Sequence, residues 1–146
     1  MSDAENLRLV HRWQHLYDRD VHQCLDECYA DGFVVIVPGL LTITDRTVFH
    51  AIEQTVLDAA PDRVMHIDET VPVGDRVIVR ARVRYTDHAS SKPMEGCFCS
   101  ILRILEGKIT EDITYLDRTT FCGIRELHEA GLLAEAPAAK PARQRP

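Results

Sequence analysis

The chain has 146 residues, of which 45% are hydrophobic and 27% charged, with a formal net charge of −6. This composition is typical of one globular domain and excludes global disorder. The net negative charge argues against a nucleic-acid partner, because phosphate binding needs a basic face. No stretch approaches the roughly 20 apolar residues of a membrane span, and the first residues are polar, so we predict a cytoplasmic protein without membrane contact.

The first third of the chain predicts three helices. Residues 5–17 carry apolar side chains at three- and four-residue spacings, as an amphipathic helix does. Asp20 is placed to cap a second helix, and Thr44 or Asp45 can cap a third over residues 46–59. Between the last two helices, the apolar run from Phe33 predicts a strand, a turn at Pro38-Gly39 and a second short strand.

The rest of the chain alternates with a period of two and predicts four strands joined as a meander. The strands are expected over residues 63–73, 77–87, 97–105 and 109–117, followed by a short helix. Helices followed by strands indicate an α+β fold, in which helices cover one face of a curved, cone-shaped antiparallel sheet and enclose an apolar pocket. We expect one domain over residues 1–133 and a disordered Ala/Pro/Arg-rich tail over residues 134–146.

The five cysteines are odd in number and lack CxxC spacing. A disulfide framework or a zinc ribbon is therefore not expected, and buried reduced thiols are the simpler interpretation. We predict no metal and no cofactor.

The order of elements, with the segments YDRDVHQCLDECYADGF and LEGKITEDITYLDRTTF, resembles the nuclear transport factor 2-like superfamily over about residues 5–133. This superfamily includes ketosteroid isomerases, limonene epoxide hydrolases, scytalone dehydratases and SnoaL-like polyketide cyclases. The resemblance implies the cystatin-like α+β barrel fold. It does not fix the activity, because one fold hosts many chemistries.

The acids and bases of three relatives are missing at the matching positions. The base of the ketosteroid isomerases falls at Val37, and the acid of the cyclases and epoxide hydrolases falls at Thr114. Asp112 shares a strand face with Thr114, so it is a candidate substitute acid if that face lines the pocket.

The resemblance to scytalone dehydratases is closer. It rests on Trp13, Tyr17 and Asp18 in the first helix, on His66 after Pro61, and on Ser100 in the segment GCFCS. It implies Tyr17 as a donor to a carbonyl oxygen, His66 as a base or acid, and Asp18 as the group that orients His66. Ser100 would contact the ligand or a water.

Each of these residues also has a plain structural interpretation. Tyr17 fits a core position with its hydroxyl at the surface, and Asp18 fits a helix end. His66 alternates with Met65 and Ile67, so it can equally face solvent or a partner. The expected pocket walls and ligand contacts are Trp13, Phe33, Val35, Phe49, Ile52, Ser100, Leu102 and Thr114.

Arg80, Arg82 and Arg84 lie on the opposite strand face from Val79, Ala81 and Val83. They form a solvated or interface stripe if the apolar face lines the core. A register error of one residue would instead put them in the pocket, where they would bind an acidic ligand.

Two functions remain open from the sequence. One is a small cofactor-independent lyase or isomerase, of the dehydratase or cyclase kind, acting on a hydrophobic cyclic carbonyl compound. The other is a non-catalytic domain that binds an apolar ligand or serves dimerisation. A homodimer through the outer sheet face is expected from the habit of the family and from Ile78, Ile101 and the cysteines of that face.

Overall fold

The computed structural model describes residues 2–133, so the tail predicted over 134–146 lies outside the described residues. The helices are α1 (Asp3–Arg19), α2 (Val21–Cys28), α3 (Arg46–Ala59) and α4 (Ile124–Glu129). The strands are β1 (Tyr29–Val37), β2 (Leu41–Ile43), β3 (Val64–Val73), β4 (Arg76–Thr86), β5 (Pro93–Leu105) and β6 (Lys108–Leu116). The predicted helices and strands are all present, most of them with bounds within a few residues of those expected.

Side chains cap the first three helices, with Asp20 and Asp45 at the predicted positions. Ser2 and Glu5 form a reciprocal capping box at the start of α1. Asp20 accepts a hydrogen bond from the backbone nitrogen of Gln23 and starts α2, and Asp45 does the same for α3 through Val48. These caps fix the ends of the three helices that face the sheet.

The six strands form one curved, open sheet in the order β2-β1-β6-β5-β4-β3. All neighbours pair antiparallel except β1 and β6, which are parallel, so the sheet is mixed and the antiparallel prediction is corrected. The prediction came from the hairpin pattern in the sequence, and a hairpin can join only antiparallel strands. The pairing of β1 with β6 joins residues about 80 apart in sequence, and no local pattern encodes its direction.

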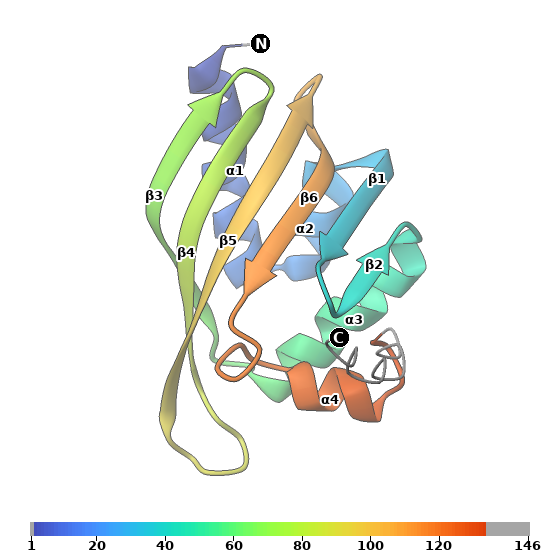
Figure 1. Ribbon diagram of the computed structural model, residues 1–146, viewed down its shortest axis with the longest axis vertical. Helices are drawn as coiled ribbons and strands as arrows, with labels where there is room; N and C mark the ends of the chain where they lie inside the picture. The colour runs from blue at the N-terminus through green and yellow to red at the C-terminus, as the bar shows by residue number, and fades with distance from the viewer. Residues whose placement is uncertain (1, 134–146) are drawn as a thin grey trace, which may run out of the picture.

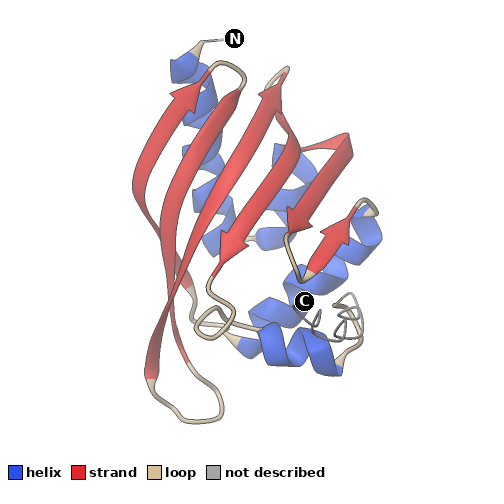
Figure 2. Cartoon of the chain, in the orientation of Figure 1, coloured by secondary structure: helices blue, strands red, loops and turns tan. Residues whose placement is uncertain are grey.

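Helices α1, α2 and α3 lie behind the sheet, and α4 closes one end (Figures 1 and 2). The inner face of β4 is fully apolar, with Val77, Val79, Ala81 and Val83 all buried. No helix of residues 2–133 lies on the opposite face of the sheet (Figure 1). This one-sided covering leaves an interior bounded by the sheet and the helices.

Candidate functional site

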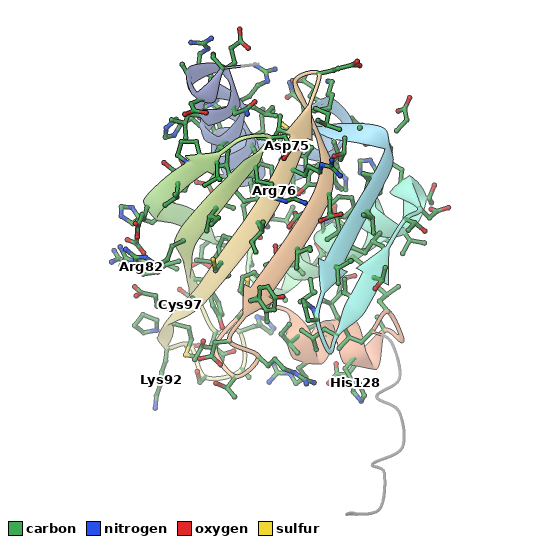
Figure 3. The ribbon with its side chains drawn as sticks, turned by 45° about the horizontal axis from the view of Figure 1, so that its top comes forward. Asp75, Arg76, Arg82, Lys92, Cys97 and His128 are labelled. Carbon is green, nitrogen blue, oxygen red and sulfur yellow. The ribbon has the colours of Figure 1, made fainter. Side chains whose placement is uncertain are left out.

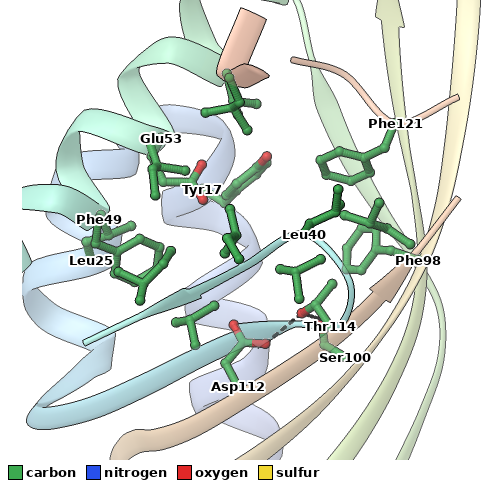
Figure 4. Close-up of a pocket in the computed structure, with 18 of the residues that line it drawn as sticks. Tyr17, Leu25, Leu40, Phe49, Glu53, Phe98, Ser100, Asp112, Thr114 and Phe121 are labelled. Atoms are coloured by element: carbon green, nitrogen blue, oxygen red, sulfur yellow. Dashed lines mark hydrogen bonds between the residues drawn. The ribbon is translucent and has the colours of Figure 1, made fainter. Parts of the chain in front are cut away.

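An apolar cavity of about 110 Å³ lies between the inner face of the sheet and helices α1, α2, α3 and α4 (Figure 4). Engineered apolar cavities of about 150 Å³ bind benzene, so this one is of the size that holds about one ring. Its walls are mostly aliphatic and aromatic. The polar residues among them are Tyr17, Cys24, Tyr29, Glu53, Ser100, Asp112 and Thr114.

Asp112 is the centre of a hydrogen-bond network on β6. Its carboxylate is buried and accepts from the Tyr29 hydroxyl at 2.7 Å and from the Thr114 hydroxyl at 2.6 Å. Because Thr114 donates to Asp112, the contact of 2.7 Å between the Ser100 and Thr114 hydroxyls has Ser100 as its donor. The Trp13 indole donates to the Tyr29 oxygen at 3.1 Å. The donors therefore all point towards the carboxylate.

Strand pairing explains why these residues meet. Asp112 and Thr114 are two residues apart on β6 and share its inner face. Thr114 pairs directly with Ser100 on β5. The predicted common face of Asp112 and Thr114 is confirmed, since both line the cavity.

Burial raises the pKa of the Asp112 carboxyl above its ordinary value, while hydrogen bonds from Thr114 and Tyr29 act in the opposite direction. Two hydroxyl donors favour the charged form of the carboxyl. The arrangement suits a carboxylate that accepts a proton from a bound molecule.

Glu53 approaches the cavity from α3, on a different wall from Asp112 (Figure 4). Its Oε2 atom is buried without a hydrogen-bond partner among the described residues. Burial raises the pKa of Glu53 to about 7, although the positive charge of Arg63 acts in the opposite direction. This carboxyl exchanges its proton near neutral pH.

Arg63 is also buried, and its guanidinium lies over the Tyr17 ring at 4.3 Å from the ring centroid. None of its three side-chain nitrogens has a hydrogen-bond partner in the described part of the chain. Burial raises the pKa of Tyr17 well above its ordinary value, so this phenol stays protonated and can donate.

A close approach between β5 and the segment before α4 places Phe121 at the cavity. A Cβ atom added to Gly96 would lie 2.8 Å from the Phe121 Cα atom, so only glycine fits there. Phe121 lines the cavity and contacts Phe98 edge to face, with ring centroids 5.9 Å apart. Gly96 thus lets an aromatic side chain from outside the sheet close part of the wall.

The expected ligand contacts are mostly found in the cavity wall. The prediction that Phe33 and Leu102 contact the ligand is wrong, because both are buried in the core and neither lines the cavity. Phe33 packs against the rings of Tyr29 and Phe49, and Leu102 is buried in the core beside Asp112, its partner on β6. The predicted residues that do line the cavity are Trp13, Tyr17, Val35, Phe49, Ile52, Ser100, Asp112 and Thr114.

The predicted cluster of Tyr17, Asp18 and His66 is not formed. Asp18 accepts a hydrogen bond of 2.9 Å from the backbone nitrogen of Met65, which fastens the end of α1 to β3. The His66 side chain is 59% exposed and lies 3.5 Å from Asp68 on the outer face. Met65 takes the inner position instead, so Asp18 and His66 are withdrawn as catalytic candidates.

Sequence reasoning missed Glu53, Tyr29 and Arg63. Glu53 follows Phe49 by four positions and precedes Val56 by three, so helical spacing places it on the apolar stripe of α3. That spacing was the available signal. Tyr29 and Arg63 stand at the edges of elements, where no periodic pattern indicates a direction.

The arginine stripe of β4 faces outward. Arg82 lies 2.7 Å from Asp68, Arg84 2.9 Å from Glu95, and Arg80 3.3 Å from Glu69. Figure 3 shows Arg82 and Cys97 on the outside of the sheet. The alternative of a cationic pocket is therefore excluded.

The five cysteines are free thiols. Within residues 2–133, no group of three or more histidine, cysteine or acidic side chains is arranged to hold a metal ion. Across the same residues, no helix combines the length and the apolar character that crossing a membrane requires.

Comparison with known proteins places this arrangement in a family. The model of the SnoaL-like domain matches residues 8–112, which is more than half of the chain. The chain belongs to the SnoaL-like domain family. The predicted membership of the nuclear transport factor 2-like superfamily is thereby confirmed. A search of functionally curated proteins gave no match.

Solved structures of low sequence identity share the fold. IdmH from Streptomyces antibioticus, a candidate polyketide cyclase, is 21% identical with a TM-score of 0.70, covering 83% of this chain and 96% of its own. An LEH-like epoxide hydrolase from M. tuberculosis is 14% identical with a TM-score of 0.67, covering 86% and 91%. An NTF2-like protein of unknown function from Burkholderia pseudomallei is 18% identical with a TM-score of 0.69, covering 80% and 92%. At these identities the likeness establishes the fold alone.

Proposed function

We propose that the SnoaL-like protein is an enzyme that transfers a proton next to the carbonyl group of a small hydrophobic, cyclic compound, using only its own side chains. Isomerisation, dehydration and cyclisation all begin with this step. The observation that carries the proposal is the buried Asp112 carboxylate in the wall of an otherwise apolar cavity. A carboxylate is costly to bury, and two hydroxyl donors hold this one in a defined position.

Asp112 acts as the base in this reaction. Its oxygens can accept a proton from a carbon of a ring that fills the cavity, because the surrounding walls are mostly apolar and the donors neutralise the carboxylate only in part. Tyr17 donates to the carbonyl oxygen, where negative charge develops as the proton leaves. Its raised pKa keeps the phenol protonated for this role.

A carbon–hydrogen exchange assay tests the proposal without knowledge of the natural substrate. Cyclohexanone in deuterated buffer exchanges its α hydrogens when a base removes them, and NMR measures the rate. We expect the wild-type protein to accelerate exchange and Asp112→Asn to lose about 10²–10⁴-fold of that acceleration.

Glu111→Gln is the matched control, because Glu111 is adjacent on β6 and points to the other face of the strand. It should exchange cyclohexanone at the wild-type rate. Binding of cyclohexanone without accelerated exchange would overturn the enzymatic proposal and favour a ligand-binding domain. Equal losses in Asp112→Asn and Glu111→Gln would remove Asp112 from the mechanism.

We also propose a homodimer formed through the outer face of the sheet. No helix among the described residues covers that face, which includes half-buried isoleucines from three central strands, with Tyr115 55% exposed beside them. Apolar side chains on an uncovered sheet favour burial against a second copy. Light scattering at micromolar concentration should give twice the chain mass, and Ile101→Glu should give the monomer mass. A monomer mass for the wild type would contradict the proposal.

A further inference from the structure

The cavity contains a second carboxyl group that proton abstraction by Asp112 does not use. Glu53 comes from α3 and Asp112 from β6, so the two acids face the same space from a helix and from the sheet (Figure 4). No hydrogen bond or ion pair joins them in the described part of the chain. A ligand in the cavity would therefore lie between two acids.

The two carboxyl groups differ in what holds them. Both oxygens of Asp112 accept from hydroxyl donors. The Oε2 atom of Glu53 is buried and has no hydrogen-bond partner within residues 2–133. A buried carboxyl without donors is stabilised in its neutral form, in which it carries a proton that it can give away.

Several charged or titratable groups surround Glu53. Among them, the buried cation Arg63 favours ionisation, and the negative charge of Asp112 opposes it. Burial outweighs the effect of Arg63. The full set comes from every element packed around the carboxyl and comprises Tyr17, His22, Cys24, Arg63, Asp112 and Cys122.

We propose that Glu53 is the general acid of this cavity and that the substrate is a β-hydroxy carbonyl compound, from which Asp112 and Glu53 together remove water. The proposal rests on the proposed function, because it takes Asp112 as the base. It adds a second catalytic residue and chooses dehydration among the reactions that begin with proton abstraction.

The step balances without any further reactant. Asp112 takes the proton from the carbon next to the carbonyl, and the electron pair of that bond forms the new carbon–carbon double bond. The bond from the β carbon to its hydroxyl breaks, and Glu53 gives its proton to the departing oxygen, which leaves as water. Asp112 ends protonated and Glu53 ionised, and exchange with water restores both.

Arg63 is a positioning residue in this arrangement. Its guanidinium stacks on the ring of Tyr17, which fixes the donor to the carbonyl oxygen. Its positive charge also keeps Glu53 from becoming a much weaker acid. A single buried cation thus acts on both groups that assist Asp112.

Two assays with single-ring compounds separate the roles of the two acids. The exchange assay with cyclohexanone needs only a base. Loss of water from 3-hydroxycyclohexanone, followed by the ultraviolet absorbance of the enone product, needs a base and an acid. We expect Glu53→Gln to lower the ratio of elimination to exchange by about 10²-fold. Asp112→Asn should lower both rates, and Asp58→Asn, an exposed acid on the same helix, should change neither.

The outcomes are distinguishable. If the wild type exchanges cyclohexanone but Glu53→Gln eliminates water as fast as the wild type, Glu53 is not the acid and the proposed function still stands. If the wild type does neither, the proposed function fails first. Circular dichroism spectra and melting temperatures serve to check that each variant is folded.

As a second variant, Arg63→Met should extend elimination to higher pH, because loss of the cation makes Glu53 hold its proton more tightly. An unchanged pH profile of elimination would contradict the role of Arg63.

Discussion

Asp112 and Glu53 face one cavity from a strand and from a helix, and their surroundings give them different chemistry. Asp112 is held by Tyr29 and Thr114, whose hydroxyls stabilise the carboxylate. Glu53 has a buried oxygen that no group of the described chain hydrogen-bonds, and burial raises its pKa to about 7. Two acids separated in this way can act as base and acid in one reaction at neutral pH. Burial raises the pKa of both acids, and the hydroxyl donors to Asp112 are what distinguishes the two.

The largest effect is expected in the pH dependence of stability, where Glu53→Gln is compared with the wild type. The pKa of Glu53 in the folded state is about 7, against an ordinary value of 4.5, so the folded state binds this proton more tightly than the unfolded chain does. Stability therefore falls as the pH rises between these values, by about 3 kcal/mol at most, and less to the extent that the side chain is exposed.

Glutamine cannot ionise, so Glu53→Gln should be more stable than the wild type at about pH 8 and should lose that advantage near pH 5. Urea unfolding followed by circular dichroism measures both free energies. Asp58→Asn, on the exposed face of α3, serves as the control. An advantage of Glu53→Gln that is the same at both pH values would show that Glu53 is already ionised at the lower one.

Variants that remove donors from the Asp112 network should be less stable than the wild type at neutral pH, because each donor stabilises the carboxylate. Thr114→Val removes a direct donor to the carboxylate and should cost about 1.5–3 kcal/mol of unfolding free energy at neutral pH. Ser100→Ala removes only the donor to Thr114 and should cost about 0.5–1.5 kcal/mol. Equal losses of unfolding free energy in the two variants would mean that Asp112 carries no charge. Asp112 and Glu53 would then not differ in ionisation.

Arg63→Met tests how the charge of Arg63 affects the pKa of Glu53. Without the cation, the pKa of Glu53 rises further, so the fall of stability with pH should extend to higher pH than in the wild type. The test is the shape of the curve of unfolding free energy against pH. Removing a buried cation also shifts the whole curve by an amount that does not depend on pH, and that shift is not part of the test. A curve parallel to that of the wild type would exclude an effect of Arg63 on Glu53.

The fold could be predicted from sequence because most of its signals are local. Apolar spacing indicated the helices, and alternation with turn residues indicated the hairpins β3–β4 and β5–β6. The parallel pairing of β1 with β6 could not be predicted, because it depends on contacts between distant segments. The sequence left open which face of β4 points inward, and the structure places Val77, Val79, Ala81 and Val83 there.

The position of His66 shows how one residue changes a site. The turn at Gly74 pairs Val73 with Arg76, and continuing this register would place His66 opposite Val83 on the inner face. The register shifts between Ile67 and Glu69, so that His66 pairs with Arg82 outside and Met65 with Val83 inside. A bulge has no reliable sequence signal, and it decides which side chain enters the cavity. No bulge separates Asp112 from Thr114, and there the alternation rule gave the correct face.

The smallest effect on stability is expected at the exposed acids on the outer face of the sheet. Glu95 is hydrogen-bonded to Arg84, and this contact lowers the pKa of its carboxyl, the reverse of what burial does to Glu53. The stabilisation is present above the ordinary pKa and is lost on acidification, but solvent and salt screen it. Arg84→Ala should therefore leave the urea midpoint at neutral pH unchanged within error, in low salt and in high salt. If Arg84→Ala clearly lowered the urea midpoint in low salt but not in high salt, the outer ion pairs would contribute to stability. Exposed acids would then affect folding as buried acids do.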